Sequence, residues 1–237
     1  MSWPMAPLSE PTGGSAMAQP TDIHYLRLFL LESVVLFPGM ELPLVVFEPR
    51  YRELTQECQE ANEPFGVLLL QAGREVGGTD VAPYQVGTTA HIEQVDQLPD
   101  GRLHVSGLGR DRFRVVSFNH DRPYLAAQVE YLPKDAGNAV PGELVQRVRD
   151  AGGQYLRAIM ALRGGYIRDV PLPEDPEELS YILAMLFQGQ RWTQQRLLEA
   201  TTTAERLTQE SQLLQDAYNQ MKDRVAERWS DRGSRRN

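Results

Sequence analysis

Three arginines occupy every second position in the run GRDRFRV. Arg110, Arg112 and Arg114 would share one face of a β-strand, because successive side chains of an extended chain point to opposite faces. A guanidinium presents planar donors that suit carboxylates and peptide carbonyls, so this row predicts a cradle for acidic groups or for a peptide backbone. The alternative is a solvated strand face whose charge is balanced by nearby acidic residues.

The sequence lacks the motifs of the common catalytic sites. Its only two lysines, Lys134 and Lys222, follow Pro133 and Met221, so neither belongs to the Gly-Lys-Ser/Thr end of a Walker A loop. No serine has the Gly-x-Ser-x-Gly flanks of a hydrolase nucleophile, and neither lysine lies in a recognisable Ser-Lys dyad motif. We therefore predict that the chain is not an enzyme and uses no cofactor.

Metal ligands are also sparse in the sequence. None of the four histidines has a partner four residues away, the spacing of a zinc-binding helix. His91 and His104 fall on neighbouring predicted strands, but satisfied or solvated side chains are the simpler interpretation, and no metal site is predicted. The single cysteine, Cys58, permits no intrachain disulfide, which favours a reducing compartment and predicts a cytoplasmic location.

The charge balance argues against two classes of partner, although local basic patches would still be compatible with it. There are 24 Lys and Arg against 32 Asp and Glu, a net charge of −8, which opposes bulk attraction to nucleic acid or to an anionic membrane. No apolar run approaches the roughly 18–20 residues that span a bilayer. Residues 1–21 show neither a signal peptide nor an Arg-rich transit peptide, and we expect them to form a disordered tail of a soluble protein.

The first half of the chain predicts a β-domain over residues 22–135. Short apolar runs alternate with Pro or Gly at intervals of about ten residues, which is typical of a small sandwich or barrel. Asp100-Gly101 between two alternating runs predicts a hairpin, and the continuous apolar run 65–70 predicts a strand buried on both faces. Pro49 is well placed as the first residue of one helix that ends near Ala61.

The second half predicts helices over residues 140–229, followed by a flexible tail at 230–237, because the apolar period changes to 3.6. Asp175 followed by Pro176 is a strong helix start, so capping explains the acidic residues around it without a catalytic or calcium site. The pair Gly152-Gly153 lies inside another helical stripe. We expect a kink or break there, since each glycine weakens a helix by about 1 kcal/mol.

The last predicted helix carries a heptad-like row of residues. Its members are Leu207, Ser211, Leu214, Tyr218, Met221, Val225 and Arg228. This row could pair with a partner or with a second copy, which would make the chain an adaptor or assembly protein. Because the row contains Ser211 and Arg228, packing against the protein's own bundle is favoured, and the chain is predicted to be a monomer or a weak homo-oligomer.

Six ordered blocks carry a resemblance to a known family. They are FPGMELPLVVFEPRYREL from Phe37, FGVLLL from Phe65, VGTTAHIEQV from Val86, DGRLHVSGLGRDRFRV from Asp100, PYLAAQVEYL from Pro123 and LPEDPEELSYILAMLF from Leu172. Together they resemble the N-terminal substrate-binding domain of the Lon proteases, in the form of stand-alone Lon N-terminal domain proteins, over about residues 24–228. The resemblance implies an α+β fold in which a PUA-like, mostly antiparallel β-barrel precedes a C-terminal helical bundle.

The resemblance also implies a function. It predicts a binding module for unfolded or tagged polypeptides that lacks the ATPase and protease domains of Lon, with a protease as a further partner. The site would be an apolar groove between barrel and bundle, together with strand addition at an open sheet edge. The predicted peptide-binding residues are Phe37, Met40, Arg50, Tyr51, Arg110, Arg112 and Arg114.

Two alternatives stand beside this prediction. Most of the same residues could be structural, with Phe37 and Tyr51 in the core and Arg50 paired with Glu48 or Glu53. The PUA-like relationship would also allow RNA binding, but the net charge of −8 opposes it. We therefore predict neither a nucleic-acid partner nor a membrane partner.

Overall fold

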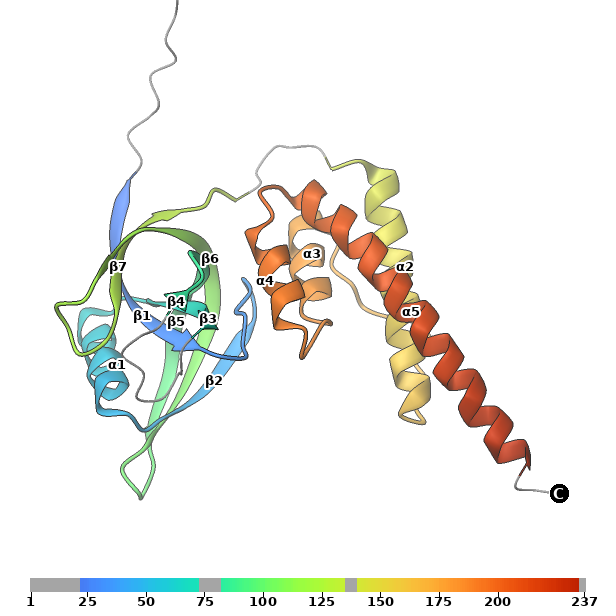
Figure 1. The fold of residues 1–237 in the computed structure, drawn as a ribbon, viewed down its shortest axis with the longest axis horizontal. Helices are drawn as coiled ribbons and strands as arrows, with labels where there is room; N and C mark the ends of the chain where they lie inside the picture. The colour runs from blue at the N-terminus through green and yellow to red at the C-terminus, as the bar shows by residue number, and fades with distance from the viewer. Residues whose placement is uncertain (1–21, 73–81, 135–139, 235–237) are drawn as a thin grey trace, which may run out of the picture.

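A computed structural model describes residues 22–72, 82–134 and 140–234 of the 237-residue chain. A β-barrel occupies the N-terminal part and a group of helices the C-terminal part (Figure 1). The predicted α+β architecture, with a mostly antiparallel sheet before the helices, is confirmed.

The barrel closes through one parallel pairing. Its strands are β1 (Ile23–Leu31), β2 (Glu41–Val46), β3 (Phe65–Ala72), β4 (Ala82–Pro83), β5 (Val86–Gln97), β6 (Leu103–Asn119) and β7 (Ala126–Tyr131). The order β1-β7-β6-β5-β3 returns to β1 through the parallel pairing of β1 with β3, and every other pairing is antiparallel. Strand β2 adds to the first half of β6, and β4 adds to β3.

Both faces of the central strands are buried, as the apolar run 65–70 predicted. One cluster includes Leu28, Leu68 and Phe113, whereas the alternate residues Phe29 and Phe65 belong to a second cluster with the helix that follows β2. This helix, α1 (Pro49–Ala61), begins and ends at the predicted residues and buries Tyr51, Leu54 and Cys58 against the barrel. The barrel therefore has one apolar core inside and another beneath α1.

The remaining helices form the second part of the molecule. They are α2 (Gly142–Leu162), α3 (Pro176–Ala184), α4 (Arg191–Glu199) and α5 (Thr203–Ser234). Leu207 and Leu214, two members of the predicted heptad-like row, are fully buried in the core that these helices share. The first half of α5 thus packs against the protein's own bundle.

Of the kink or break predicted at Gly152-Gly153, the break is wrong, because α2 continues through both glycines. A Cβ atom at Gly152 would lie 2.6 Å from Cδ2 of Leu183. The glycine therefore permits close packing of α2 against α3, and this packing outweighs the weak helical propensity of the pair.

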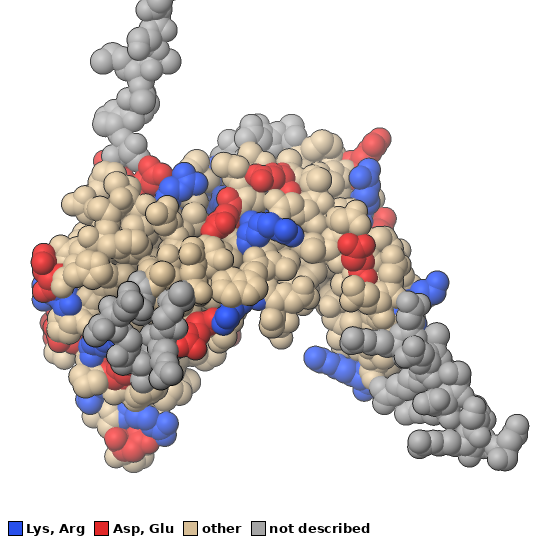
Figure 2. Space-filling model, viewed as in Figure 1, with Lys and Arg blue, Asp and Glu red and all other residues tan. Residues whose placement is uncertain are grey.

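The surface carries mixed charges. On the face drawn in Figure 2, acidic and basic side chains are interspersed, and the outline is hollowed on its lower side between the barrel and the helices. Within the described segments, no helix is both long and apolar enough to cross a membrane.

Candidate functional site

A pocket of about 250 Å³ lies where the barrel meets the helices. The barrel contributes Pro38 and Gly39, the stretch 108–112 of β6, and the stretch 132–134 that follows β7. The helical part contributes Asp175, the N-cap of α3, and Glu177, Glu178 and Tyr181 from the first turns of this helix. We call this hollow the junction pocket, because segments from both parts of the molecule build it.

A tight turn forms one wall of the junction pocket. The N–H of Met40 donates to the C=O of Phe37 at 3.1 Å, and Gly39 has a φ of 78°. Residues 37–40 therefore form a β-turn with Pro38 and Gly39 at its two central positions, as is typical of a type II turn. The turn lies directly on β6, since the N–H of Gly109 donates to the C=O of Met40 at 2.9 Å. A Cβ at Gly109 would lie 2.2 Å from the Phe37 oxygen, so only glycine allows this approach.

The opposite wall is the start of α3. The Asp175 side chain accepts a hydrogen bond from the Glu178 N–H at 2.8 Å, which confirms the predicted helix cap. The Tyr181 hydroxyl donates to Glu177 Oε1 at 3.0 Å, and the Tyr181 ring lies 6.3 Å from the Phe37 ring. Burial raises the pKa of Tyr181, which keeps it a neutral hydrogen-bond donor. This wall therefore presents carboxylates around an aromatic ring.

The arginine row does not form one continuous cradle. Arg110 is exposed in the junction pocket, but Arg112 is only 4% exposed and donates to the C=O groups of Leu198 and Ala200 at 2.9 and 2.7 Å. Arg112 thus caps the C-terminal end of α4. Arg114 is exposed elsewhere on β6, where its guanidinium lies 3.7 Å from Glu130.

The other predicted site residues lie on two elements. Phe37 is fully buried and Met40 half-buried beside the junction pocket. Tyr51, on α1, is buried and stacks on Phe29 with ring centroids 4.0 Å apart. Arg50 pairs with Glu48 at 3.0 Å, which was one of the predicted pairings. Neither Arg50 nor Tyr51 lines the junction pocket.

Sequence reasoning missed the apolar lining of the junction pocket. Leu108, Leu132 and Tyr181 come from three segments that are distant in the chain. Each one is an ordinary core residue by type, and no local pattern distinguishes them. The acidic start of α3 was visible in the sequence, but helix capping explained it fully.

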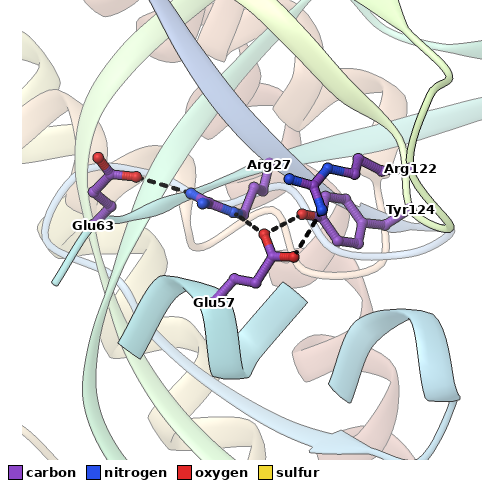
Figure 3. Close-up of polar contacts among 5 residues, drawn as sticks. All are labelled: Arg27, Glu57, Glu63, Arg122 and Tyr124. Atoms are coloured by element: carbon purple, nitrogen blue, oxygen red, sulfur yellow. Dashed lines mark hydrogen bonds and ion pairs between the residues drawn. The ribbon is translucent and has the colours of Figure 1, made fainter. Parts of the chain in front are cut away.

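A charged cluster fastens α1 to the barrel (Figure 3). Glu57 accepts hydrogen bonds from Arg27 at 2.9 Å, from Arg122 at 3.1 Å and from the Tyr124 hydroxyl at 2.6 Å. Arg27 also pairs with Glu63 at 2.8 Å. The cluster therefore joins the C-terminal half of α1 to β1 and to the segment that precedes β7.

The pKa values in this cluster indicate a structural role. The hydrogen bonds from Tyr124 and Arg27 lower the pKa of Glu57. Burial, together with the Glu57 carboxylate, raises the pKa of Tyr124 to about 12. A general acid or base works best when its pKa lies near the operating pH, and these shifts move both groups away from neutrality.

His91 and His104 do not approach each other. In the ladder between β5 and β6, His91 lies opposite Leu108 and His104 lies opposite Asp96. The two histidines are thus offset by five residues along the strands, roughly 16 Å. Among the residues that the structure describes, no group of three or more metal-ligating side chains is close enough to hold an ion.

Comparison with known proteins gives consistent matches. A family model described as the ATP-dependent protease La (LON) substrate-binding domain matches residues 25–216. Lon protease 2 of Herpetosiphon aurantiacus is 30% identical over 194 residues, which are 80% of this chain and 23% of that protein. The Lon protease of Paraburkholderia phytofirmans is 30% identical over 63% of this chain and 20% of that protein. The chain therefore spans less than a quarter of the length of either relative.

Solved structures show the same fold. A Lon N-terminal domain protein from Xanthomonas campestris has a TM-score of 0.58 at 28% identity, covering 78% of this chain and 96% of that one. The N-terminal domain of the Lon protease from the Mycobacterium avium complex has a TM-score of 0.57 at 16% identity. Since the family match covers most of the barrel and most of the helices, the chain belongs to the family of the Lon substrate-binding domain.

Proposed function

We propose that this chain is a non-enzymatic binding module that captures exposed segments of unfolded polypeptides in the junction pocket. The observation that carries the proposal is the composition of the pocket. Leu108, Leu132 and Tyr181 offer apolar contacts, while Arg110 and the α3 carboxylates offer polar ones. Ligand pockets in proteins commonly combine an apolar lining with a few polar groups that fix orientation.

The family match supports the same function, because its description names a substrate-binding domain. The matched relatives are proteases, so a protease that receives the captured polypeptide is the partner we propose. The single cysteine supports a cytoplasmic location for this binding. The interspersed charges in Figure 2 and the net charge of −8 favour polypeptides over nucleic acids as ligands.

The experiment measures the affinity of the purified chain for a permanently unfolded protein, reduced and carboxymethylated α-lactalbumin, by fluorescence anisotropy. We expect Arg110→Glu to weaken binding about tenfold, because it replaces a cation by a carboxylate in a pocket that Asp111, Asp175, Glu177 and Glu178 already line. Arg114→Glu is the matched control, since it makes the same charge change at an exposed position of the same strand outside the pocket. Equal effects of the two variants, or no measurable binding by the folded wild-type chain, would contradict the proposal.

A further inference from the structure

Near its end, strand β5 directs part of its backbone away from β6, which is its one partner there among the described residues. The N–H of Leu98 donates to the C=O of Arg102 at 2.8 Å, and the ladder keeps this register back to Gln94. Hydrogen-bonded and non-hydrogen-bonded pairs alternate in an antiparallel ladder. Val95 and Gln97 therefore point their N–H and C=O groups away from β6. No other strand among the described residues pairs with this part of β5.

Strands β2, β6 and β5 lie side by side in this region, with β2 at the edge opposite β5. The edge of β2 is less suited than that of β5 to pairing with an added strand. The hydrogen bond from Gly109 to the C=O of Met40 sets the alternation, so Glu41, Pro43 and Val45 face outward. Proline has no N–H, and prolines on edge strands hinder further strand pairing. The edge of β5 between Glu93 and Gln97 contains no proline and keeps its donors.

A groove runs beside this edge of β5. Two hollows, of about 230 and 540 Å³, lie between α1 and the β5–β6 hairpin, and both are lined by Gln59 and Val95. In Figure 1 this hairpin projects from the lower end of the barrel. Gln56 and Gln59 of α1, and Asn62 directly after it, line the groove, and such side chains can both donate and accept hydrogen bonds. The groove thus has room for the side chains of an added strand.

The charged side chains that line the groove indicate which kind of segment it would bind. The lining contains three carboxylates, from Glu53, Glu63 and Glu93, and one guanidinium, from Arg52. The pairing of Glu63 with Arg27 neutralises one of these carboxylates, and the lining still has more acidic than basic groups. A basic segment complements this charge. A second copy of the chain would place acidic edges side by side, which is unfavourable. Residues 1–21 contain no Lys or Arg, so the chain's own N-terminal stretch offers no basic side chain either.

We propose that the β5 edge is a second polypeptide-binding site, which takes an extended, basic segment of another protein as an added strand. Its backbone pairs with Val95 and Gln97, and its alternate side chains enter the groove beside α1. Backbone pairing supplies affinity for any extended chain, whereas the acidic groove supplies the preference for basic residues. The site lies outside the junction pocket and works independently of it.

The test uses a fluorescein-labelled ten-residue peptide of alternating lysine and valine. We expect Gln97→Pro to weaken its binding at least about tenfold, because the variant removes one outward N–H. Gln97→Ala keeps that N–H and should bind like the wild type. The same peptide methylated on alternate backbone nitrogens should lose binding, and a glutamate-valine peptide should bind more weakly. Equal affinities of the two variants, or full binding of the methylated peptide, would overturn the proposal.

Three further measurements distinguish the proposed site from the junction pocket, and a basic segment of another protein from a second copy of the chain or residues 1–21. Arg110→Glu should leave binding of the lysine-valine peptide unchanged, whatever it does to unfolded α-lactalbumin. A wild-type dimer that Gln97→Pro dissociates in sedimentation velocity would identify a second copy as the occupant and overturn the proposal. Deletion of residues 1–21 should not change the peptide affinity; a gain in affinity would identify that stretch as the occupant and overturn it as well.

Discussion

Two ionisable residues in α5 lie one turn apart and are fully buried, namely Arg206 and Glu210. Arg206 donates to the C=O of Leu197 at 3.1 Å and to the hydroxyl of Ser180 at 2.8 Å, and its guanidinium lies over the ring of Tyr181. Neither carboxyl oxygen of Glu210 has a hydrogen-bond partner among the described residues. Burial raises the pKa of Glu210 well above its usual range, against the opposing charge of Arg206.

This pKa shift predicts how stability depends on pH. A carboxyl group whose pKa is raised by folding holds its proton in the native state, so its favourable contribution is complete below the ordinary pKa of about 4.3. The contribution is lost as the pH rises through the raised native value. We expect Glu210→Gln to remove this loss and to increase the free energy of unfolding at pH 8 by about 1–3 kcal/mol.

Urea denaturation at pH 5 and pH 8 measures this effect. Asp216→Asn is the matched control, because Asp216 is an exposed carboxylate on the same helix. We expect the control to match the wild type at both pH values. A Glu210→Gln variant that is less stable than the wild type at pH 8 would show that the buried carboxylate is charged and favourable.

At the scale of elements, the two adjacent glycines of α2 have different surroundings. A Cβ at Gly152 would meet Leu183, which is fully buried in α3, at 2.6 Å. A Cβ at Gly153 would lie 3.4 Å from the guanidinium of Arg157, the end of a flexible side chain. The same helix thus contains one glycine that packing requires and a neighbour that packing does not require.

Alanine substitutions should separate these two roles. Gly153→Ala should stabilise the protein by about 0.5–1 kcal/mol, because alanine favours the helix and an ordinary contact accepts its methyl group. Gly152→Ala should destabilise it by about 1–3 kcal/mol, since the added methyl group overpacks the contact with Leu183. Thermal and urea denaturation of both variants measure the difference. Equal stabilisation by both would show that α2 and α3 can separate at little cost.

At the scale of the whole molecule, side chains from each part bind backbone oxygens of the other. Arg112 of the barrel caps α4 at the C=O groups of Leu198 and Ala200. In the opposite direction, Gln195 donates to the C=O of Val86 at 3.0 Å, and Arg191 donates to the C=O of Glu32 at 2.6 Å. These contacts join α4 to the barrel.

Removal of the Arg112 guanidinium should loosen the junction. We expect Arg112→Met to lower the free energy of unfolding by about 2–4 kcal/mol, because two buried carbonyls lose their donor. The amide protons of α4 should exchange with solvent faster, while those of the barrel interior keep their protection. Hydrogen exchange measured by mass spectrometry checks this, with Arg114→Met as the control at an exposed site. Unchanged exchange in α4 would show that apolar contacts alone hold the junction.

Local signals in the sequence determined many of the elements. Pro49 begins α1, Asp175 caps α3, and the hairpin after β5 turns at Gly101, which has a φ of 83°. Each of these depends on the conformational preferences of a few adjacent residues, which act in the same way in any fold. The six blocks between Phe37 and Phe187 were similarly sufficient to predict the family and the α+β class.

Tertiary contacts decided the features that depend on which faces meet. The alternation of the three arginines was visible in the sequence, but Arg112 is buried against the C-terminal end of α4, whereas Arg110 is exposed in a pocket. The continuity of α2 at Gly152 likewise depends on the approach of Leu183 from α3. Sequence patterns describe the period and the polarity of each element by itself. The partner of each face, and therefore the junction pocket and the open edge of β5, follows from packing between segments that are distant in the chain.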